Sequence, residues 1–324
     1  MILSNKRILV IGGAGFIGSH TVDLLLKKDV KEVIVFDNFS RGSIKNLEKS
    51  INDKRLKILE NVDIRNQNNL DKYTKKIDVV LIFSALWLLH CHEYPREAFE
   101  TNIYGTFNIL ESCVKNKVKK IIFSSSASVY GDALYQPMDE VHPLNQKNFY
   151  GATKVCGEAM LRSYYYRYKL NYISLRYMNV YGPRQDTKGA YVSVIVNVLK
   201  NIFRNKKPII FGSGKESFDF INVKDCAAAN ILAIQKNQNN ICLNIGSGQK
   251  TSLNNLVKLI LKICKSDIEI NYKKQNNKTL VKNRIGSTDL ARKKIMFKAK
   301  INLKDGLTDF INWFKKDYFW WKLD

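Results

Sequence analysis

The sequence predicts an α/β protein in which helices cover both faces of a doubly wound parallel sheet, followed by a smaller region of mixed α/β structure. Short runs of Val, Ile and Leu alternate with helical segments through the first half of the chain, as strands buried on both faces require. A glycine-rich loop follows the first of these runs. After about residue 179 the alternation becomes irregular and Gly and Pro interrupt it, which marks a second arrangement.

The order of the elements follows from the apolar runs. The chain has 324 residues, 45% of them hydrophobic, which allows one large domain or two coupled ones. The expected strands are residues 7–11, 32–36, 56–60, 79–83, 120–124 and 172–177. The expected helices are residues 17–28, 99–116, 150–169, 252–264 and 303–316. The longest apolar run, residues 79–89, is too short to span a bilayer, so we expect a buried strand that continues into an apolar loop.

The glycines of the first loop carry the clearest binding signal. Gly12, Gly15 and Gly18 have the spacing G-x-x-G-x-x-G, after an apolar strand and before an amphipathic helix. Glycine permits a tight turn and a close backbone approach to a pyrophosphate, and the following helix N-terminus offers free N–H groups and a partial positive charge. The sequence therefore predicts a Rossmann-type site for a dinucleotide.

An acidic residue after the second strand indicates which dinucleotide binds. Asp37 follows Gly18 by about 20 residues, where a carboxylate accepts hydrogen bonds from the adenosine ribose and repels a 2′-phosphate. This favours NAD over NADP, although Arg41 nearby is a residue type that accommodates a 2′-phosphate. Asp63 and Ile64 follow the third strand, where we expect them to meet the adenine ring.

A tyrosine and a lysine predict chemistry on a hydroxyl group. Tyr150 and Lys154 lie four residues apart at the start of a helix, so they share one face. A free tyrosine has a pKa near 10, and we expect the ammonium and a positive nicotinamide to lower the pKa of Tyr150. The strand before them ends in three serines, at the sheet edge where ligands bind, and a serine there can relay a proton to Tyr150.

With these motifs in order, the chain resembles the extended short-chain dehydrogenase/reductase family. Within it, the similarity is to the NAD-dependent nucleotide-sugar epimerases and dehydratases, and most of all to the UDP-glucose (UDP-galactose) 4-epimerases. The similarity covers nearly the whole chain. Its landmarks are Gly12–Gly18, Asp37-Asn38, Asp63-Ile64-Arg65 and residues 102–106, 124–131, 150–154, 176–184 and 219–225.

The resemblance implies a role for each matching residue. The catalytic residues are Ser126, Tyr150 and Lys154. The cofactor-binding residues are Gly12, Gly15, Phe16, Ile17, Gly18, Asp37, Asn38, Asp63, Ile64, Asn102, Ser124, Tyr150, Lys154 and Tyr177. The substrate-binding residues are Ser126, Tyr150, Asn179 and Arg284. Lys154 would also hold the nicotinamide ribose, and Asn102 would be a structural or active-site hydrogen bonder.

Two departures from the family pattern concern the substrate. The family often has an arginine just before Asp219 that grips the pyrophosphate, whereas this chain has Phe218, so we expect Arg284 to serve instead. The family's His-Leu-Ala-Ala reads Ile-Phe-Ser-Ala at residues 82–85, and residues 86–91 are unusually apolar. If that segment lines the pocket, the sugar is less polar than a simple hexose, such as a deoxy or N-acetyl sugar.

The expected reaction is 4-epimerisation through a transient 4-keto sugar. A 4,6-dehydratase also needs an acid and a base to remove water, which the family places as an Asp-Glu pair after the active-site hydroxyl residue. Ala127 and Ser128 occupy those positions and can do neither. A uronic-acid decarboxylase stays a further alternative, and a non-catalytic NAD-binding regulator a distant one. Which nucleotide the substrate carries is left open, with UDP favoured.

The resemblance also implies a domain division and an assembly. Residues 1–178 with about 218–246 would form the NAD-binding domain, and about 179–217 with 247–324 the nucleotide-sugar-binding domain. The long helices that start near Phe99 and Tyr150 resemble those that pair into a four-helix bundle in the family's dimers. A homodimer is therefore expected.

Composition narrows the partners. The chain has 53 basic and 29 acidic residues, a net charge of +24, but the lysines are scattered and form no block interleaved with aromatics. We therefore expect no nucleic acid and no membrane as partner. The six cysteines form no C-x-x-C pair and no His lies at metal-ligand spacing, which predicts a reduced, cytoplasmic protein without a metal. The first strand begins too early to leave room for a signal peptide.

Overall fold

The computed structural model describes residues 1–187, 193–274 and 283–318. Its centre is a seven-stranded sheet in the order β3-β2-β1-β4-β5-β6-β11, and every neighbouring pair is parallel. The strands are β1 (Arg7–Ile11), β2 (Glu32–Phe36), β3 (Leu56–Leu59), β4 (Val79–Ile82), β5 (Lys120–Ser126), β6 (Asn171–Tyr177) and β11 (Ile241–Ile245). The strand order reverses between β1 and β4, which is where such sheets bind ligands.

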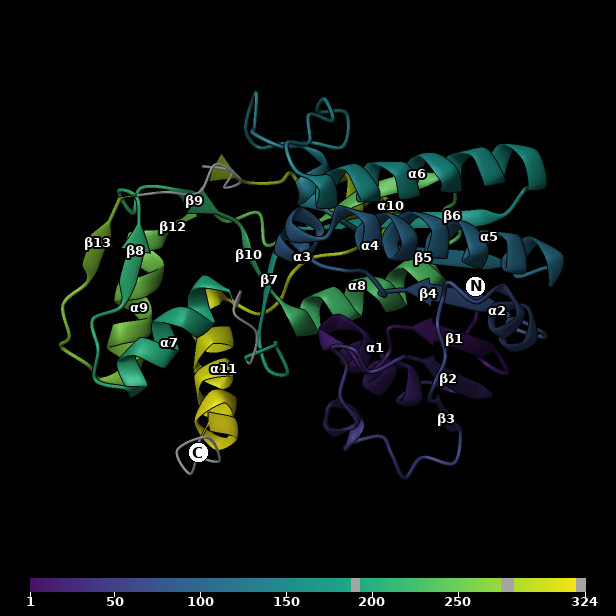
Figure 1. The fold of residues 1–324 in the computed structure, drawn as a ribbon, viewed down its shortest axis with the longest axis horizontal. Coiled ribbons are helices and arrows are strands. Elements are labelled where there is room, and N and C mark those ends of the chain that lie inside the picture. The colour runs from purple at the N-terminus through teal and green to yellow at the C-terminus, as the bar shows by residue number, and fades with distance from the viewer. Residues whose placement is uncertain (188–192, 275–282, 319–324) are drawn as a thin grey trace.

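Helices cover both faces of this sheet (Figure 1). One face carries α1 (Phe16–Leu26) and α8 (Val223–Gln235), and the other carries α2 (Gln67–Tyr73), α5 (Gly105–Lys115) and α6 (Phe149–Tyr168). The two cores divide each strand by alternation. In β4, Val79 and Leu81 belong to the first core, whereas Val80 and Ile82 belong to the second. The predicted doubly wound α/β fold is therefore confirmed.

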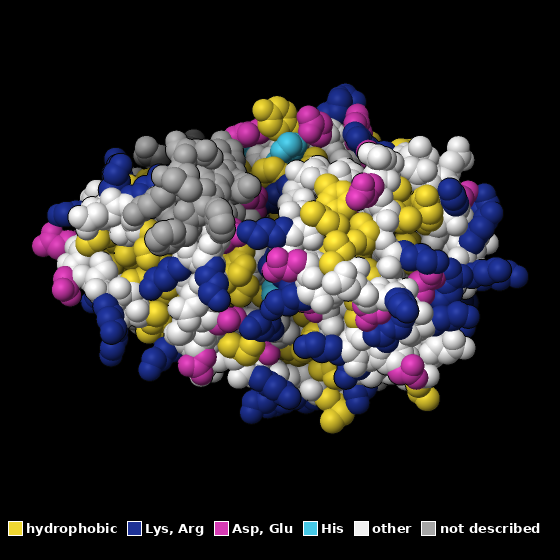
Figure 2. Space-filling model, turned by 90° about the horizontal axis from the view of Figure 1, so that it is seen from below, with side chains coloured by type: hydrophobic (Ala, Val, Ile, Leu, Met, Phe, Trp, Pro, Cys, Tyr) yellow, Lys and Arg dark blue, Asp and Glu magenta, His cyan; other side chains and the backbone are white. Residues whose placement is uncertain are grey.

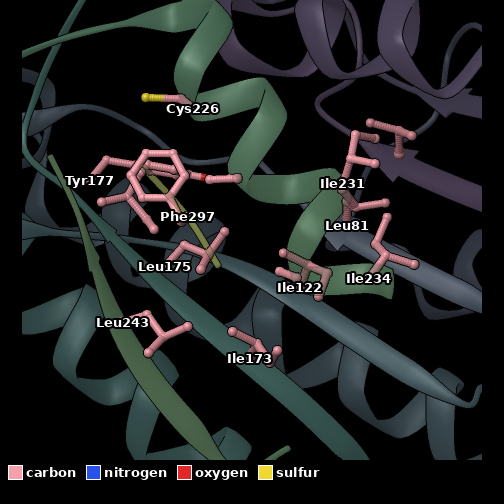
Figure 3. Packing of buried hydrophobic residues seen from close by; sticks show 14 of the residues in the cluster. Leu81, Ile122, Ile173, Leu175, Tyr177, Cys226, Ile231, Ile234, Leu243 and Phe297 are labelled. Atoms are coloured by element: carbon pink, nitrogen blue, oxygen red, sulfur yellow. The ribbon is translucent and has the colours of Figure 1, made fainter. Parts of the chain in front are cut away.

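The first core shows how sheet and helix interlock. Figure 3 shows Leu81, Ile122 and Ile173 projecting from neighbouring strands toward Ile231 and Ile234 of α8. All five are at most 5% exposed. Burial of a side chain of this size contributes about 1.5–3 kcal/mol, so these contacts fix the sheet on which the site is built.

The helix expected over residues 99–116 starts earlier, at Pro95, and contains a segment of π-helix. It runs through α4 (Pro95–Ala98), a π-helical segment η2 (Phe99–Tyr104) and α5. The apolar loop expected up to residue 89 is partly wrong, because a short helix, α3 (Leu88–Glu93), forms within it. Helix α3 ends before Pro95, because a proline disfavours the helical conformation in the residue that precedes it, here Tyr94.

A third core holds the second region together. It is formed by α7 (Val194–Phe203), α9 (Leu253–Cys264) and α11 (Leu303–Tyr318), with side chains such as Leu199, Leu256 and Phe310 fully buried. Short strands accompany it: β7 (Asn179–Tyr181) with β10 (Phe220–Asn222), β8 (Ile209–Phe211) with β13 (Asn271–Lys273), and β9 (Ser217–Phe218) with β12 (Thr251–Ser252) and β14 (Asn283–Arg284). The predicted residue bounds of the two domains stay a prediction.

One late segment joins the first core rather than the third. In α10 (Asp289–Ile295), Ala291 and Ile295 are buried among the residues that line the sheet, as is Phe297 after it. The aromatic run at residues 319–321, which the sequence predicts to pack against the domain or a neighbouring subunit, lies outside the described residues. No helix within the described ranges is both long and apolar enough to cross a membrane. Figure 2 shows Lys and Arg spread over the visible face with Asp and Glu between them.

Candidate active site

The glycine loop between β1 and α1 is shaped for close approach. A Cβ at Gly18 would lie 2.2 Å from the carbonyl oxygen of Gly12, and one at Gly12, whose φ is +77°, would lie 2.6 Å from the backbone nitrogen of Ser84. Gly15 is the N-cap of α1, with no side-chain cap and no acidic residue in the first turn. The helix N-terminus therefore keeps its positive end for an anion, and this cradle fits a dinucleotide pyrophosphate.

Asp37 stands at the end of β2 and is tied to that loop. Its carboxylate accepts hydrogen bonds from the backbone N–H of Ala14 at 2.9 Å and of Phe39 at 2.9 Å. Burial raises the pKa of Asp37, and these two bonds oppose the rise. Asn38 is exposed and accepts from the N–H of Ser40. The expected contacts of Asp37 and Asn38 with the adenosine ribose stay a prediction.

The side chain of Arg41 is held by two contacts within the protein. Its guanidinium donates to Asp186 at 2.7 Å and lies over the ring of Trp87, 3.8 Å from the centroid. Asp186 offsets part of the guanidinium charge and the Trp87 ring covers one face of it, so Arg41 is less available to a 2′-phosphate. This arrangement agrees with the choice of NAD over NADP.

Asp63 and Ile64 lie after β3, as expected of residues that meet an adenine ring. Ile64 is buried, whereas Asp63 is partly exposed and accepts from the guanidinium of Arg65 at 2.6 Å. A shallow cavity opens beside them, lined by Asp63, Arg65, Asn66, Gln67 and Tyr104.

The catalytic candidates come together at the carboxyl end of β5. Asn148 caps α6 by accepting from the N–H of Gly151 at 2.8 Å, which starts the helix one residue before Tyr150. The Nζ of Lys154 donates to the carbonyl of Ser124 at 2.7 Å and lies 5.6 Å from the ring centroid of Tyr150. Ser126 ends β5 and lies close to the Tyr150 hydroxyl. The structure thus brings Ser124, Ser126, Tyr150 and Lys154 into one site.

Without bound NAD the pKa of Tyr150 is raised, and its expected lowering in the presence of the positive nicotinamide stays a prediction. Burial raises the pKa of Tyr150 to about 12, and the Cys91 thiol adds to the rise. Ser126, Arg284 and Arg41 oppose the rise in the Tyr150 pKa. Burial also lowers the pKa of Lys154 to about 8. The prediction considers the charges of Lys154 and the nicotinamide, and burial in the cofactor-free protein acts against both.

Asn102 holds the turn that follows β4. Its amide accepts from the N–H of Leu86 at 2.7 Å and donates to the carbonyl of Leu86 at 3.0 Å and to the hydroxyl of Thr153 at 3.2 Å. This is the structural role expected of it. A direct contact with the cofactor stays a prediction.

The side chain of Tyr177 is packed into the first core, and its expected contact with the cofactor stays a prediction. Its ring is 4% exposed in the first core, near Leu175 and Phe297 (Figure 3). Its hydroxyl donates to Asn230 of α8 at 2.6 Å. Successive residues of a strand point to opposite faces, and Tyr177 falls on the face that α8 covers.

Arg284 lies beside the position of Phe218, where the family often has an arginine. In the parallel pair of β14 and β9, Arg284 is directly opposite Phe218. Burial lowers the pKa of Arg284 to about 10, opposed by Asp132 and Tyr150, and its Nε has no hydrogen-bond partner among the described residues. Asn179 lies at the start of β7 and donates to the carbonyl of Asp219 at 3.2 Å. Arg284 therefore lies near enough to Tyr150 to interact with it electrostatically, whereas the expected contact of Asn179 with the substrate stays a prediction.

Sequence reasoning missed Glu158, one turn beyond Lys154 on α6. Its carboxylate pairs with Arg176 of β6 at 2.7 Å, and both side chains are at most 5% exposed. Ser125 donates to the same carboxylate at 2.6 Å. The spacing of Tyr150, Lys154 and Glu158 at i, i+4 and i+8 was the available signal, since it puts all three on one helix face.

A second set of contacts joins α1 to the segment after β7. The Nε2 of His20 lies 3.0 Å from the carbonyl of Pro183, and Arg184 pairs with Asp23 at 2.8 Å. With the Arg41–Asp186 pair, these contacts fasten residues 183–186 to the cofactor-binding half of the molecule.

His20 predicts how the fold responds to acid. Burial lowers its pKa to about 4; the Pro183 carbonyl and Asp23 oppose this, and Arg184 and Lys224 reinforce it. Between pH 6.5 and 4 the unfolded chain therefore takes up a proton that the folded protein refuses, so stability falls as the pH drops through this window. The full penalty, below pH 4, is about 3 kcal/mol.

Replacement of this histidine removes the penalty. We expect urea unfolding of His20→Gln to lose less stability than the wild type on acidification from pH 6.5 to 4. The exposed His92 is the matched control, and His92→Gln should keep the wild-type dependence on pH. Equal acid sensitivity of His20→Gln and the wild type would contradict the assignment.

Within the described residues, no group of three or more His, Cys, Asp and Glu side chains is placed to hold a metal ion.

Among known proteins, the model of the NAD-dependent epimerase/dehydratase family matches residues 8–246. A putative UDP-glucose 4-epimerase of Methanocaldococcus jannaschii is 38% identical, over 96% of this chain and 99% of that protein. The human dTDP-D-glucose 4,6-dehydratase is 30% identical, over 98% of this chain and 92% of that protein.

Among solved structures, a UDP-N-acetylglucosamine 4-epimerase of Methanobrevibacter ruminantium in complex with UDP-N-acetylmuramic acid superposes with a TM-score of 0.91. It is 33% identical and covers 97% of this chain and 99% of that chain.

Proposed function

Because this chain belongs to the NAD-dependent epimerase/dehydratase family, we propose that it catalyses the 4-epimerisation of a nucleotide-linked hexose with NAD as its cofactor. The observation that carries the proposal is the meeting of Tyr150, Lys154 and Ser126 beside the glycine loop. The positions after Ser126 support epimerisation over dehydration. Ala127 and Ser128 are buried in the turn η3 (Ala127–Val129) and provide no acid and base pair.

The side chains divide the work on the substrate hydroxyl. Tyr150 takes the proton of the sugar 4-hydroxyl, with Ser126 as the relay that holds that hydroxyl, and returns the proton after the sugar has turned over. Lys154, fixed by the Ser124 carbonyl, keeps a positive charge behind the phenol. Gly12–Gly18, Asp37 and Lys154 would hold NAD, which would supply a hydride acceptor and a positive charge that favours the phenolate.

The nucleotide and the sugar follow from the relatives. Structures similar to this chain include a UDP-glucose 4-epimerase with UDP-glucose and the UDP-N-acetylglucosamine 4-epimerase, so we propose a UDP-linked glucose or galactose, or its N-acetyl form, as substrate. The apolar residues 86–91 are consistent with the N-acetyl forms. This reaction belongs to carbohydrate metabolism and supplies sugars for polysaccharide biosynthesis.

A panel of nucleotide sugars tests the function. The purified protein is incubated with UDP-glucose, UDP-N-acetylglucosamine, dTDP-glucose and UDP-glucuronic acid, and products are read by NMR. A 4-epimer of a UDP-hexose is expected. A 4-keto-6-deoxy sugar would assign a dehydratase instead, a pentose a decarboxylase, and no product with any of them a non-catalytic NAD-binding protein.

We further propose that the protein is a cytoplasmic homodimer. The six cysteines are all free, as in a reducing compartment. Phe99, Tyr104 and Phe107, on the helical stretch that ends with α5, are 50%, 47% and 41% exposed. A second copy would cover these rings in a helix bundle. Sedimentation equilibrium is expected to give twice the chain mass, and Phe107→Glu to shift it toward the monomer.

Arg284 predicts how the substrate phosphates are held. Removal of its guanidinium in Arg284→Gln is expected to raise KM about 10- to 100-fold, because a charge-assisted hydrogen bond contributes about 1.5–3 kcal/mol, with a smaller effect on kcat. Steady-state kinetics on the best substrate of the panel measures both. Phe218→Arg in the Arg284→Gln background places an arginine directly opposite and is expected to recover part of the affinity. An unchanged KM in Arg284→Gln would contradict the role.

A further inference from the structure

The turn between β4 and α3 carries polar atoms that the proposed chemistry does not use. Ser84 and Trp87 each bury a polar atom, the hydroxyl oxygen and the indole Nε1, without a hydrogen-bond partner in the described part of the chain. A buried donor without an acceptor is costly, because it has given up water and gained nothing. A side chain fixed in that state points to an acceptor that comes from outside the chain.

The indole of Trp87 is held so that it cannot turn its N–H to water. Asn102 fixes both the N–H and the carbonyl of Leu86, the residue before it. The guanidinium of Arg41 covers one face of the ring at 3.8 Å from the centroid, and Asp186 holds that guanidinium in place. The His90 ring lies 4.8 Å away, centroid to centroid. The donor is therefore pre-organised.

The turn that carries this donor adjoins the active site. The turn starts at Ser84, whose backbone nitrogen is so close to Gly12 that a Cβ there would approach it to 2.6 Å. Asn102 also bonds Thr153, the neighbour of Lys154, and Arg41 acts on the pKa of Tyr150. The turn that carries Trp87 thus contacts the cofactor loop through Ser84, and Asn102, which holds this turn, bonds the catalytic helix at Thr153.

We propose that Trp87 is a specificity-determining residue whose Nε1–H donates a hydrogen bond to an oxygen of the ligand held beside Tyr150. An indole only donates, so the site selects an acceptor. A carbonyl, carboxylate or hydroxyl oxygen on the sugar and the carboxamide oxygen of NAD share this chemistry. The inference rests on the proposed function for the identity of the ligand. It predicts that a sugar without an oxygen at the contacted position binds more weakly.

The variant Trp87→Phe tests this, because it keeps an aromatic face for Arg41 and removes the N–H together with part of the indole ring. Trp313→Phe is the matched control, since Trp313 stacks on Phe310 of α11 in the third core. Isothermal titration is done with UDP, UDP-glucose and UDP-N-acetylglucosamine, and the NAD content of the purified proteins is measured after denaturation. Trp87→His, which restores a ring N–H, serves as the rescue variant.

We expect Trp87→Phe to bind the nucleotide sugar about three- to tenfold more weakly with UDP unchanged, which places the acceptor on the sugar. A lower NAD content with unchanged sugar binding places it on the cofactor. Either result supports the inference, as does partial recovery in Trp87→His. Sugar affinity and NAD content both within twofold of the wild type would overturn it. A wild type that turns over no nucleotide sugar would count against the proposed function alone, since the NAD measurement still decides the role of Trp87.

Discussion

Tyr150→Phe is expected to lower kcat by about 10²- to 10⁴-fold while the protein stays folded. The loss is the contribution of a positioned general base, which the phenyl ring cannot replace. The fold should survive because the change removes one hydroxyl and keeps the ring, and Ser126 stays anchored by the N–H of Ser128 at 3.1 Å. Steady-state turnover measures the first effect, and thermal unfolding the second.

A control on the same helix makes the result specific. Tyr166 is 64% exposed on α6, so Tyr166→Phe is expected to keep both activity and melting temperature. If Tyr150→Phe keeps more than a tenth of the wild-type kcat, Tyr150 is not the base.

The pH profile of the wild type adds an independent readout. Burial raises the pKa of Tyr150 to about 12 in the protein alone, so the phenolate is scarce at neutral pH and its fraction grows as the pH rises. A positive charge brought by NAD favours the phenolate. The limb of kcat/KM that rises with pH should therefore lie well below pH 12 for the NAD-loaded enzyme, and it should disappear in Tyr150→Phe.

The parts of the site that depend on local pattern could be predicted from the sequence. The glycine loop, the Tyr150–Lys154 pair and the serines that end β5 each lie on one turn or one strand end, so spacing is enough to place them. Arg284 needed the resemblance to a family, and its pairing with Phe218 was then found in the structure.

The missed features depend on contacts between distant segments. Arg41 pairs with Asp186, which is 145 positions away in the sequence, and no repeating pattern in the sequence predicts such a contact. The surroundings of Tyr177 could not be predicted for another reason. A strand covered on both faces shows no alternation of polar and apolar residues, so the sequence does not tell that Tyr177 of β6 lies on the face that α8 covers.

Glu158→Gln is expected to lower the free energy of unfolding by about 3–5 kcal/mol, the cost of leaving one member of a buried ion pair without its partner. Burial acts to raise the pKa of Glu158, but the hydrogen bonds and charge of Arg176 outweigh it and hold the pKa below its usual value, so the carboxylate is ionised at neutral pH. The neutral amide cannot balance the guanidinium of Arg176, which is also bonded to the hydroxyl of Tyr130 at 2.9 Å.

The unfolding midpoint in urea measures this loss, and a surface pair gives the scale. Lys207 and Glu269 pair at 2.8 Å with exposed side chains, so Glu269→Gln is expected to leave the urea midpoint close to that of the wild type. A Glu158→Gln protein as stable as Glu269→Gln would refute the importance of the buried pair.

The double variant Glu158→Leu/Arg176→Met removes the ion pair but keeps buried side chains in its place, so it tests the charges separately from the packing. Replacement of both members by apolar side chains leaves no isolated charge, so the double variant is expected to be more stable than Glu158→Gln.

The activity of the double variant should still fall, because the pair does more than stabilise the fold. Arg176 reaches Tyr130, Tyr130 donates to Asn244 at 2.6 Å, and Asn244 donates to the carbonyl of Ser287, close to Arg284. Through these contacts the helix that carries Tyr150 and Lys154 is tied to the strand that carries the expected phosphate ligand. A stable double variant with a raised KM would show that this buried network aligns the two halves of the site.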